Sequence, residues 1–317
     1  MAADAPLAVH FNDCRVAIAV SGGADSMALL LLARAWAAAH GGEMVALTVD
    51  HGLREAAAAE ARQVAVWCHQ LGVSHHILNA AAMGIAIKRR QADAREARYQ
   101  LLSAWCAANG YPALATGHHR GDQAETLFFR LGRGSGLLGL ASIAPLSQRH
   151  GISLVRPLLN IPKSQLINYL HAQSQPWLED ESNHSPRYVR NVLRRALQQQ
   201  PDYERIEARA AALAEFFGRM RGHVEHQLSA SLAETTRMDG GHAILSLSGF
   251  KHLPCELGLL MLARLITQLT GDTHPPRSAK LARLARCLKD EDFTAYELAG
   301  LGFKRIGVDA IKISGKT

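Results

Sequence analysis

Short apolar runs alternate with longer helical runs over the first 120 residues of this chain, and this alternation limits the fold more than any other feature. Each short run is almost wholly apolar, as expected of a strand that is buried on both faces. Strands that alternate with helices of this length form parallel sheets. We therefore predict an α/β fold, a Rossmann-like parallel sheet with helices on both faces. The predicted strands are residues 15–20, 44–52, 75–78, 112–119 and 153–159, and the predicted helices are residues 25–40, 57–72, 90–110, 122–132 and 161–173.

The polar stretch at residues 198–204 (QQQPDYE) separates two parts of different character. The part before it carries the alternation of strands and helices. The part after it is mostly helical, with one weak β-like run at residues 241–250. We expect a first domain over residues 1–200 and a smaller, mostly helical C-terminal domain over residues 201–317.

The composition excludes several classes of protein. The chain is 48% hydrophobic and 20% charged, which is typical of a globular protein. It lacks the apolar run of about 18 residues that a membrane span needs, and its first residues do not resemble a signal peptide, so we expect a cytoplasmic protein with no membrane partner. Its five cysteines form no Cys-x-x-Cys pair, so we expect reduced, structural thiols. A net charge of +7 favours polyanionic partners.

The segment Ser-Gly-Gly-Ala-Asp-Ser, residues 21–26, stands where the first strand meets the first helix. A turn with two glycines lets backbone N–H groups approach a phosphate, and the amino end of the next helix faces the same anion. The Asp25 carboxylate would repel that phosphate unless Mg²⁺ lies between them. No Walker A lysine and no Gly-x-Gly-x-x-Gly pattern is present. The candidate nucleotide-binding residues are Ser21, Gly22, Gly23, Ala24, Asp25 and Ser26, with hydroxyl donors on both serines.

This segment resembles the Ser-Gly-Gly-x-Asp-Ser signature of the N-type ATP pyrophosphatases, or PP-loop proteins. The resemblance implies an adenine nucleotide alpha-hydrolase-like fold. It also implies that ATP and Mg²⁺ are cofactors and that adenylation of a substrate releases pyrophosphate.

Later segments resemble one branch of that family, the tRNA(Ile)-lysidine synthetases. The similar segments follow in the family's order over residues 14–197, and the most distinctive is Gly-His-His-x-x-Asp-Gln-x-Glu-Thr with a glycine-rich loop after it, in residues 115–143. The resemblance implies a ligase that forms a C–N bond. ATP adenylates O2 of the wobble cytidine in a CAU-anticodon tRNA(Ile), the ε-amine of free L-lysine attacks C2, and AMP leaves. The codon read would change from AUG to AUA.

Two acidic residues, Asp122 and Glu125, share one helix face directly after a predicted strand. Open α/β sheets bind ligands at this edge. One carboxylate would hold the lysine ammonium group and the other would accept its proton, and which of them is the base stays open. We expect Asp122 near the metal or the amine, and Glu125 toward the lysine. Asp25 and Asp122 are thus the candidate metal ligands, and two solvated acids on an exposed helix are the alternative.

Two further pairs of residues end strands at the same edge of the sheet. Asp50 and His51 are expected to line the nucleotide pocket, although plain turn residues are the alternative. His118 and His119 are adjacent, so they point to opposite sides of an extended segment and cannot form a simple bidentate metal site. We expect one of the two, for which we favour His118, to contact a phosphate or the ribose, and a packed or capping histidine is the alternative for this pair.

Several arginines are candidates for phosphate and RNA contacts. The family resemblance implies one arginine in the helix over residues 90–110 that serves the nucleotide or the transition state, and we favour Arg98 over Arg95. Four cations within residues 187–195 repel one another unless an anion lies nearby. In the C-terminal domain, residues 277–289 predict a helix with a leucine stripe and a basic remainder that suits RNA phosphates. The family resemblance implies that Arg190, Asn191 and Arg194 face the tRNA or the substrate. With the nearby Arg187 they are the candidate RNA-binding residues, and a solvated basic helix is the alternative.

Two other functions are compatible with the sequence. A tRNA thiolase on the same fold would depend on a cysteine and a sulfur donor, and the missing Cys-x-x-Cys pair counts against it. A non-catalytic RNA-binding protein would release no AMP, and the intact loop at residues 21–26 counts against that. The sequence leaves a homodimer open.

Overall fold

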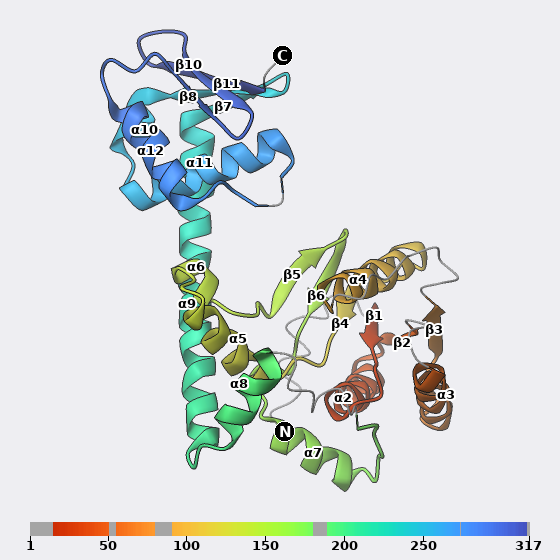
Figure 1. The fold of residues 1–317 in the computed structure, drawn as a ribbon. Coiled ribbons are helices and arrows are strands. Elements are labelled where there is room, and N and C mark those ends of the chain that lie inside the picture. The colour runs from red at the N-terminus through yellow and green to blue at the C-terminus, as the bar shows by residue number, and fades with distance from the viewer. Residues whose placement is uncertain (1–14, 51–54, 80–90, 180–188, 273, 316–317) are drawn as a thin grey trace. The chain divides into compact units, whose positions relative to one another are not determined.

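The five predicted strands and one further strand form a six-stranded sheet in the first part of the chain (Figure 1). The computed structural model describes residues 15–50, 55–79, 91–179, 189–272 and 274–315. The strand order is β3-β2-β1-β4-β6-β5, and all neighbours are parallel except β5, which is antiparallel to β6. The strands are β1 (Arg15–Ala19), β2 (Glu43–Asp50), β3 (His75–Asn79), β4 (Ala113–Ala115), β5 (Leu146–Arg149) and β6 (Ile152–Val155).

The helices of this part confirm the predicted alternation. Two short elements were not predicted, namely the edge strand β5 and a helix within the glycine-rich loop. The described helices are α2 (Ala24–His40), α3 (Glu55–Gln70), α4 (Gln91–Ala108), α5 (Arg120–Gly132), α6 (Leu137–Leu140), α7 (Lys163–Ala172), α8 (Val189–Gln198) and α9 (Tyr203–Thr235).

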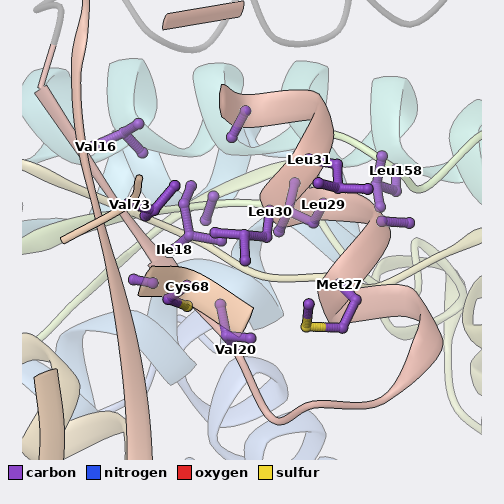
Figure 2. Close-up of a cluster of buried hydrophobic side chains, with 14 of the residues drawn as sticks. Val16, Ile18, Val20, Met27, Leu29, Leu30, Leu31, Cys68, Val73 and Leu158 are labelled. Atoms are coloured by element: carbon purple, nitrogen blue, oxygen red, sulfur yellow. The ribbon is translucent and has the colours of Figure 1, made fainter. Parts of the chain in front are cut away.

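Strand β1 is covered on both faces because its side chains alternate between two apolar clusters. Val16, Ile18 and the following Val20 pack with α2, α3 and α7. Figure 2 shows these three side chains with those of Met27, Leu29, Leu30 and Leu31 from α2. Ala17 and Ala19 instead pack in a second cluster that includes residues of α4. This two-sided burial explains why the strand has no polar position after Arg15.

Contacts divide the chain into two compact units, residues 1–218 and 219–317, and the division falls within α9. The predicted boundary at residue 200 lies just before this helix. In its described residues the second unit contains the end of α9, three further helices and an antiparallel sheet in the order β7-β8-β11-β10-β9. The helices agree with the predicted helical character, whereas of the sheet only the β-like run at residues 241–250, which contains β8, was predicted. Its elements are β7 (Thr236–Asp239), β8 (His242–Ser246), α10 (Leu247–His252), α11 (Cys255–Thr270), α12 (Ser278–Lys289), β9 (Ala295–Leu298), β10 (Leu301–Arg305) and β11 (Ala310–Gly315).

The core of the second unit joins its sheet to its helices. Phe303 and Ile313 of the sheet are fully buried in one cluster with the leucines of α11 and α12. The predicted leucine stripe of residues 277–289 is confirmed, since Leu281, Leu284 and Leu288 are all buried. Within the described residues, no helix combines the length and apolar character that a membrane crossing requires.

Candidate nucleotide and substrate site

The site lies where the order of the strands reverses. The chain runs from β1 to β2 and β3 on one side of β1, and β4 then pairs with the opposite side of β1. The loops that follow β1 and β4 therefore meet at the carboxyl edge of the sheet, which is where open α/β sheets bind ligands. The two loops are in contact: a Cβ atom on Gly117 would lie only 2.9 Å from the backbone carbonyl of Asp25.

The loop after β1 has the shape of an anion-binding turn. Gly22 has a φ of +87°, which favours glycine, and its side-chain position is filled by Leu178. The Ser26 hydroxyl donates to the Gly23 carbonyl at 2.9 Å and accepts from the Ser21 N–H at 3.1 Å. Within the described residues, the N-cap position of α2 is Gly23, which provides no side-chain cap to the helix. Ser26 is buried and shapes the loop, whereas the exposed Ser21 keeps a hydroxyl at the surface of the turn.

Asp25 carries an unpaired carboxylate oxygen. Its Oδ1 atom is buried and, within the described residues, has no hydrogen-bond partner. Its Oδ2 atom lies 3.6 Å from Lys163 Nζ and 3.8 Å from His119 Nε2. Burying an ionised oxygen without a partner is costly, so this atom favours a bound cation.

His119 connects Asp25 with Asp122. Its Nδ1 accepts the Gly121 N–H at 2.9 Å, so the proton of the neutral ring is on Nε2. That Nε2 lies 3.7 Å from Asp122 Oδ2 and 3.8 Å from Asp25 Oδ2. Asp122 also accepts the backbone N–H of His119 at 3.0 Å, which completes the cap of α5. His119 caps α5, which is the alternative role considered for this pair of histidines. Its position between two acids was not predicted.

His118 points to the other side, as the adjacent histidines require. Its Nε2 accepts from Arg95 Nη2 at 3.1 Å, and its Nδ1 donates to Thr116 Oγ1 at 2.8 Å. Burial lowers the pKa of His118 to about 3, so the ring is neutral at physiological pH. His118 thus holds Arg95, and its expected contact with a phosphate or ribose stays a prediction.

Glu125 and Asp122 have different electrostatic surroundings on one face of α5. Glu125 is buried, and its carboxylate receives two hydrogen bonds from the Arg194 guanidinium, one of them 3.0 Å long. Burial raises the pKa of Glu125, although Arg194 opposes this effect. Burial acts on Asp122 in the same direction, but His119 and its backbone N–H lower the pKa of Asp122 overall. Of the two acids, Glu125 therefore has the greater affinity for a proton.

A cavity of about 670 Å³ opens beside the loop after β1. Ligand pockets are usually about 300–1,000 Å³, so this volume suits a nucleotide. Arg98 lines the cavity, whereas Arg95 contacts His118. Asp50 is buried at the end of β2, and His51 lies outside the described residues. The lining comes from the loop (Val20, Ser21, Gly23, Ala24, Asp25), β2 (Leu47, Thr48, Val49), α3 (Ala57, Glu60, Ala61), α4 (Arg98, Leu102), α7 (Lys163, Ile167), the segment Trp177, Leu178 and Glu179, and α8 (Arg194, Arg195, Gln198).

A second cavity of about 310 Å³ adjoins the first and is richer in acids. Asp25, Lys163, Arg194 and Gln198 line both cavities, so they form the wall between them. The other lining residues are His119, Asp122, Glu125, Pro162, Ser164, Tyr203, Glu204 and Glu207.

Helix α8 uses part of its basic face to contact α5. Arg194 binds Glu125, and the Arg190 guanidinium lies 5.5 Å from the centre of the Phe129 ring. Asn191 is half-buried, and Arg187 lies outside the described residues. Arg194 was expected to face the tRNA or the substrate, and in the structure it is paired with Glu125 inside the site, so an RNA contact by Arg194 stays a prediction. RNA contacts by the other three residues stay predictions.

Two residues of the site, Lys163 and Glu207, were not predicted from the sequence. Lys163 had a signal, because it begins the helix after the last parallel strand and so stands at the same edge of the sheet. Glu207 had no such signal, because it lies in the long helix α9, far along the chain. It lines the smaller cavity and accepts two hydrogen bonds from Arg120, at 3.1 and 3.0 Å.

Comparison with known proteins agrees with this geometry. Residues 3–201 match the PP-loop domain family. The tRNA(Ile)-lysidine synthase of Ruegeria pomeroyi is 38% identical over 278 residues, covering 87% of this chain and 66% of that protein. The tRNA(Ile)-lysidine synthase of Wolbachia pipientis wMel is 34% identical over 307 residues, covering 96% of this chain and 71% of that protein. This chain therefore spans about two thirds of the length of these relatives.

A solved structure shows the same fold at low sequence identity. The U34-tRNA thiolase NcsA from Methanococcus maripaludis, determined with its 4Fe-4S cluster, matches with a TM-score of 0.58 and 14% identity. The match covers 70% of this chain and 79% of that one. At this identity the likeness concerns the fold alone.

Proposed function

Because the chain belongs to the tRNA(Ile)-lysidine synthase family, whose members are ATP-using tRNA-modifying ligases, we propose that it joins free L-lysine to the wobble cytidine of the CAU-anticodon tRNA(Ile). The observation that carries this proposal is the pair of adjoining cavities with a shared wall of Asp25, Lys163, Arg194 and Gln198. A nucleotide phosphate in one cavity and an amine in the other would both reach a base held at that wall. We place this activity in the cytoplasm, where tRNA, ATP and lysine meet.

ATP fits the larger cavity, with its phosphates at the loop over residues 21–26. The uncapped amino end of α2 offers backbone donors, and Lys163 and Arg98 offer positive charge. The site also fits Mg²⁺, because the unpaired Asp25 Oδ1 and the Asp122 carboxylate are the hard oxygen ligands that this ion prefers, with phosphate oxygens and waters completing its shell. A bound Mg²⁺ would neutralise charge on the phosphates.

Lysine fits the smaller, acidic cavity. The Glu125 carboxylate already binds a cation there, the guanidinium of Arg194, and the lysine ammonium group has the same charge. We propose that Glu125 accepts the proton of the attacking amine, since its pKa is raised, and that the ionised Asp122 stabilises charge beside it. Cytidine O2 first attacks the α-phosphate of ATP and releases pyrophosphate. The amine then attacks C2, and the C2–O bond breaks to release AMP.

Transfer of labelled lysine tests this function. The full chain is incubated with ATP, Mg²⁺, radiolabelled lysine and a tRNA(Ile) transcript that bears CAU. The matched control is elongator tRNA(Met), which has the same anticodon. We expect ATP-dependent label in tRNA(Ile) only. Binding of tRNA without label or AMP would instead indicate the non-catalytic RNA-binding function.

The substitution Glu125→Gln is expected to raise KM for lysine by roughly 10- to 100-fold, which corresponds to the free energy of a hydrogen bond to a charged group. The KM for ATP should stay within about twofold. The amide keeps the shape of the side chain but cannot attract the ammonium group or accept its proton. The matched control is Glu256→Gln, at an exposed position of α11. Steady-state kinetics with either lysine or ATP as the varied substrate measure the two KM values. Equal rises in both KM values would contradict a lysine-specific role of Glu125.

Alkylation of the cysteines is expected to leave lysine transfer unchanged, in contrast to a thiolase. Burial raises the pKa of the Cys68 thiol to about 11 and that of Cys106 to about 12, so neither forms the reactive thiolate at neutral pH. Mass spectrometry after iodoacetamide treatment should find label on the exposed Cys255 and none on Cys68 or Cys106. Loss of lysine transfer on alkylation would favour the thiolase alternative.

A further inference from the structure

Two arginines from different elements pack against one buried tyrosine beside the site. Tyr99 is 4% exposed. The guanidinium of Arg149, from β5, lies 4.2 Å from the centre of its ring, and that of Arg95, one turn earlier on α4, lies 5.3 Å from it. Arg95 Nη2 is also 3.4 Å from the Tyr99 hydroxyl and 3.1 Å from His118 Nε2.

A third arginine, Arg156, reaches the same place from the residue after β6. It is 9% exposed, and its Nη1 donates to the Ala144 carbonyl at 2.6 Å and to Ser147 Oγ at 3.1 Å. Its Nε is buried and has no hydrogen-bond partner within the described residues. A buried N–H group of a cation is costly to leave unsatisfied, so this atom favours an acceptor from outside the protein. We call Arg95, Arg149 and Arg156 the arginine cluster.

The arginine cluster lacks matching negative charge. Within the described residues its only ion pair joins Arg149 to Glu96, which also binds His150. Burial lowers the pKa of Arg156, and the nearby Arg95 and Arg149 lower it further. Like charges held this close disfavour one another. An anion bound among them would remove this repulsion, and the guanidinium groups match the geometry of phosphate oxygens.

The position of the arginine cluster separates it from the nucleotide cavity. That cavity lies beside β1 and β2 and is lined by Arg98, and no member of the cluster lines it. The arginine cluster instead lies near the ends of β4 and β6. Arg156 directly follows β6, and His118, which contacts Arg95, follows β4. We propose that the arginine cluster binds a backbone phosphate of the RNA strand, next to the nucleotide that is modified. This rests on the proposed function, because it assumes that the base enters the site from this side.

The substitution Arg95→Gln tests the proposal in the full chain, because Arg95 is exposed and its loss leaves the core intact. The probe is an RNA stem-loop with a CAU anticodon, and its Kd is measured over a series of salt concentrations. We expect binding about tenfold weaker and a plot of log Kd against log salt that is less steep by about 0.7 to 1. The Kd for ATP should stay within about twofold. Arg156→Gln should act in the same direction, and Arg34→Gln, at an exposed position of α2, is the matched control.

Two results would overturn the proposal. If Arg95→Gln weakens ATP as much as RNA, the phosphate belongs to the nucleotide. If RNA affinity and its salt dependence match those of the unsubstituted chain, the cluster has only a structural role, whether or not Arg156→Gln folds. Failure of lysine transfer in the unsubstituted chain, with the RNA effect of Arg95→Gln still present, would refute the proposed ligase activity and support the phosphate site.

Discussion

Replacing Gly117 with alanine is expected to lower kcat by about 100-fold, the typical cost of a displacement near 1 Å at a catalytic site. The new Cβ atom would lie 2.9 Å from both the carbonyl carbon and the oxygen of Asp25 and 3.1 Å from the Ser26 nitrogen. These atoms are backbone, so they cannot rotate away, and the loops after β1 and β4 must separate. Such overpacking should also lower the free energy of unfolding by about 1–3 kcal/mol.

The matched control for Gly117→Ala is Gly132→Ala, at the last residue of α5. A Cβ atom on Gly132 would meet no heavy atom within 4 Å, so this substitution should leave kcat unchanged and the free energy of unfolding equal or slightly higher. Lysine transfer measures kcat, and urea titration measures stability. A Gly117→Ala protein with normal kcat and normal stability would show that the two loops do not need this close contact.

The sequence predicts those residues of the site whose positions follow from the order of strands and helices along the chain. Apolar runs show which segments become strands, and a ligand edge follows from the carboxyl ends of parallel strands. The loop over residues 21–26, Asp122 and Glu125 were therefore predictable, and all of them lie at that edge. His118 and His119 do point to opposite sides, because side chains alternate along an extended segment.

The part that the sequence does not predict depends on pairing between distant residues. Arg194 was expected to face the tRNA or the substrate, and only the packing of α8 on α5 shows that it pairs with Glu125, 69 residues earlier. Glu207 joins the site from 87 residues after its partner, Arg120. In the second unit the strands are short and carry outward charges such as Lys304 and Lys312, so their apolar alternation is weak. Their sheet forms because Phe303, Ile311 and Ile313 share one core with the helices.

Replacing Asp25 with asparagine is expected to lower the rate of AMP formation by about 10³-fold, since a metal ligand supplies several kcal/mol of charge stabilisation in the transition state. Asparagine has nearly the same shape but carries no charge. Its neutral amide cannot replace the carboxylate as a charged ligand of Mg²⁺, for which the buried Asp25 Oδ1, without a partner among the described residues, is the candidate atom. AMP formation is measured with tRNA(Ile), ATP and lysine over a range of Mg²⁺ concentrations. Asp202→Asn, at an exposed position with only a local pairing to Arg205, is the control and should keep normal turnover.

The stability of the Asp25→Asn protein separates a catalytic role from a structural one. The carboxylate has one buried oxygen without a partner, and its contact with Lys163 is half-exposed and therefore weak. Removing the charge should thus leave the thermal midpoint unchanged or raise it, as is common where a residue is kept for function at the expense of stability. A large fall in the midpoint together with lost activity would mean that Asp25 mainly holds the loop. Normal AMP formation with normal Mg²⁺ dependence would exclude Asp25 as the metal ligand.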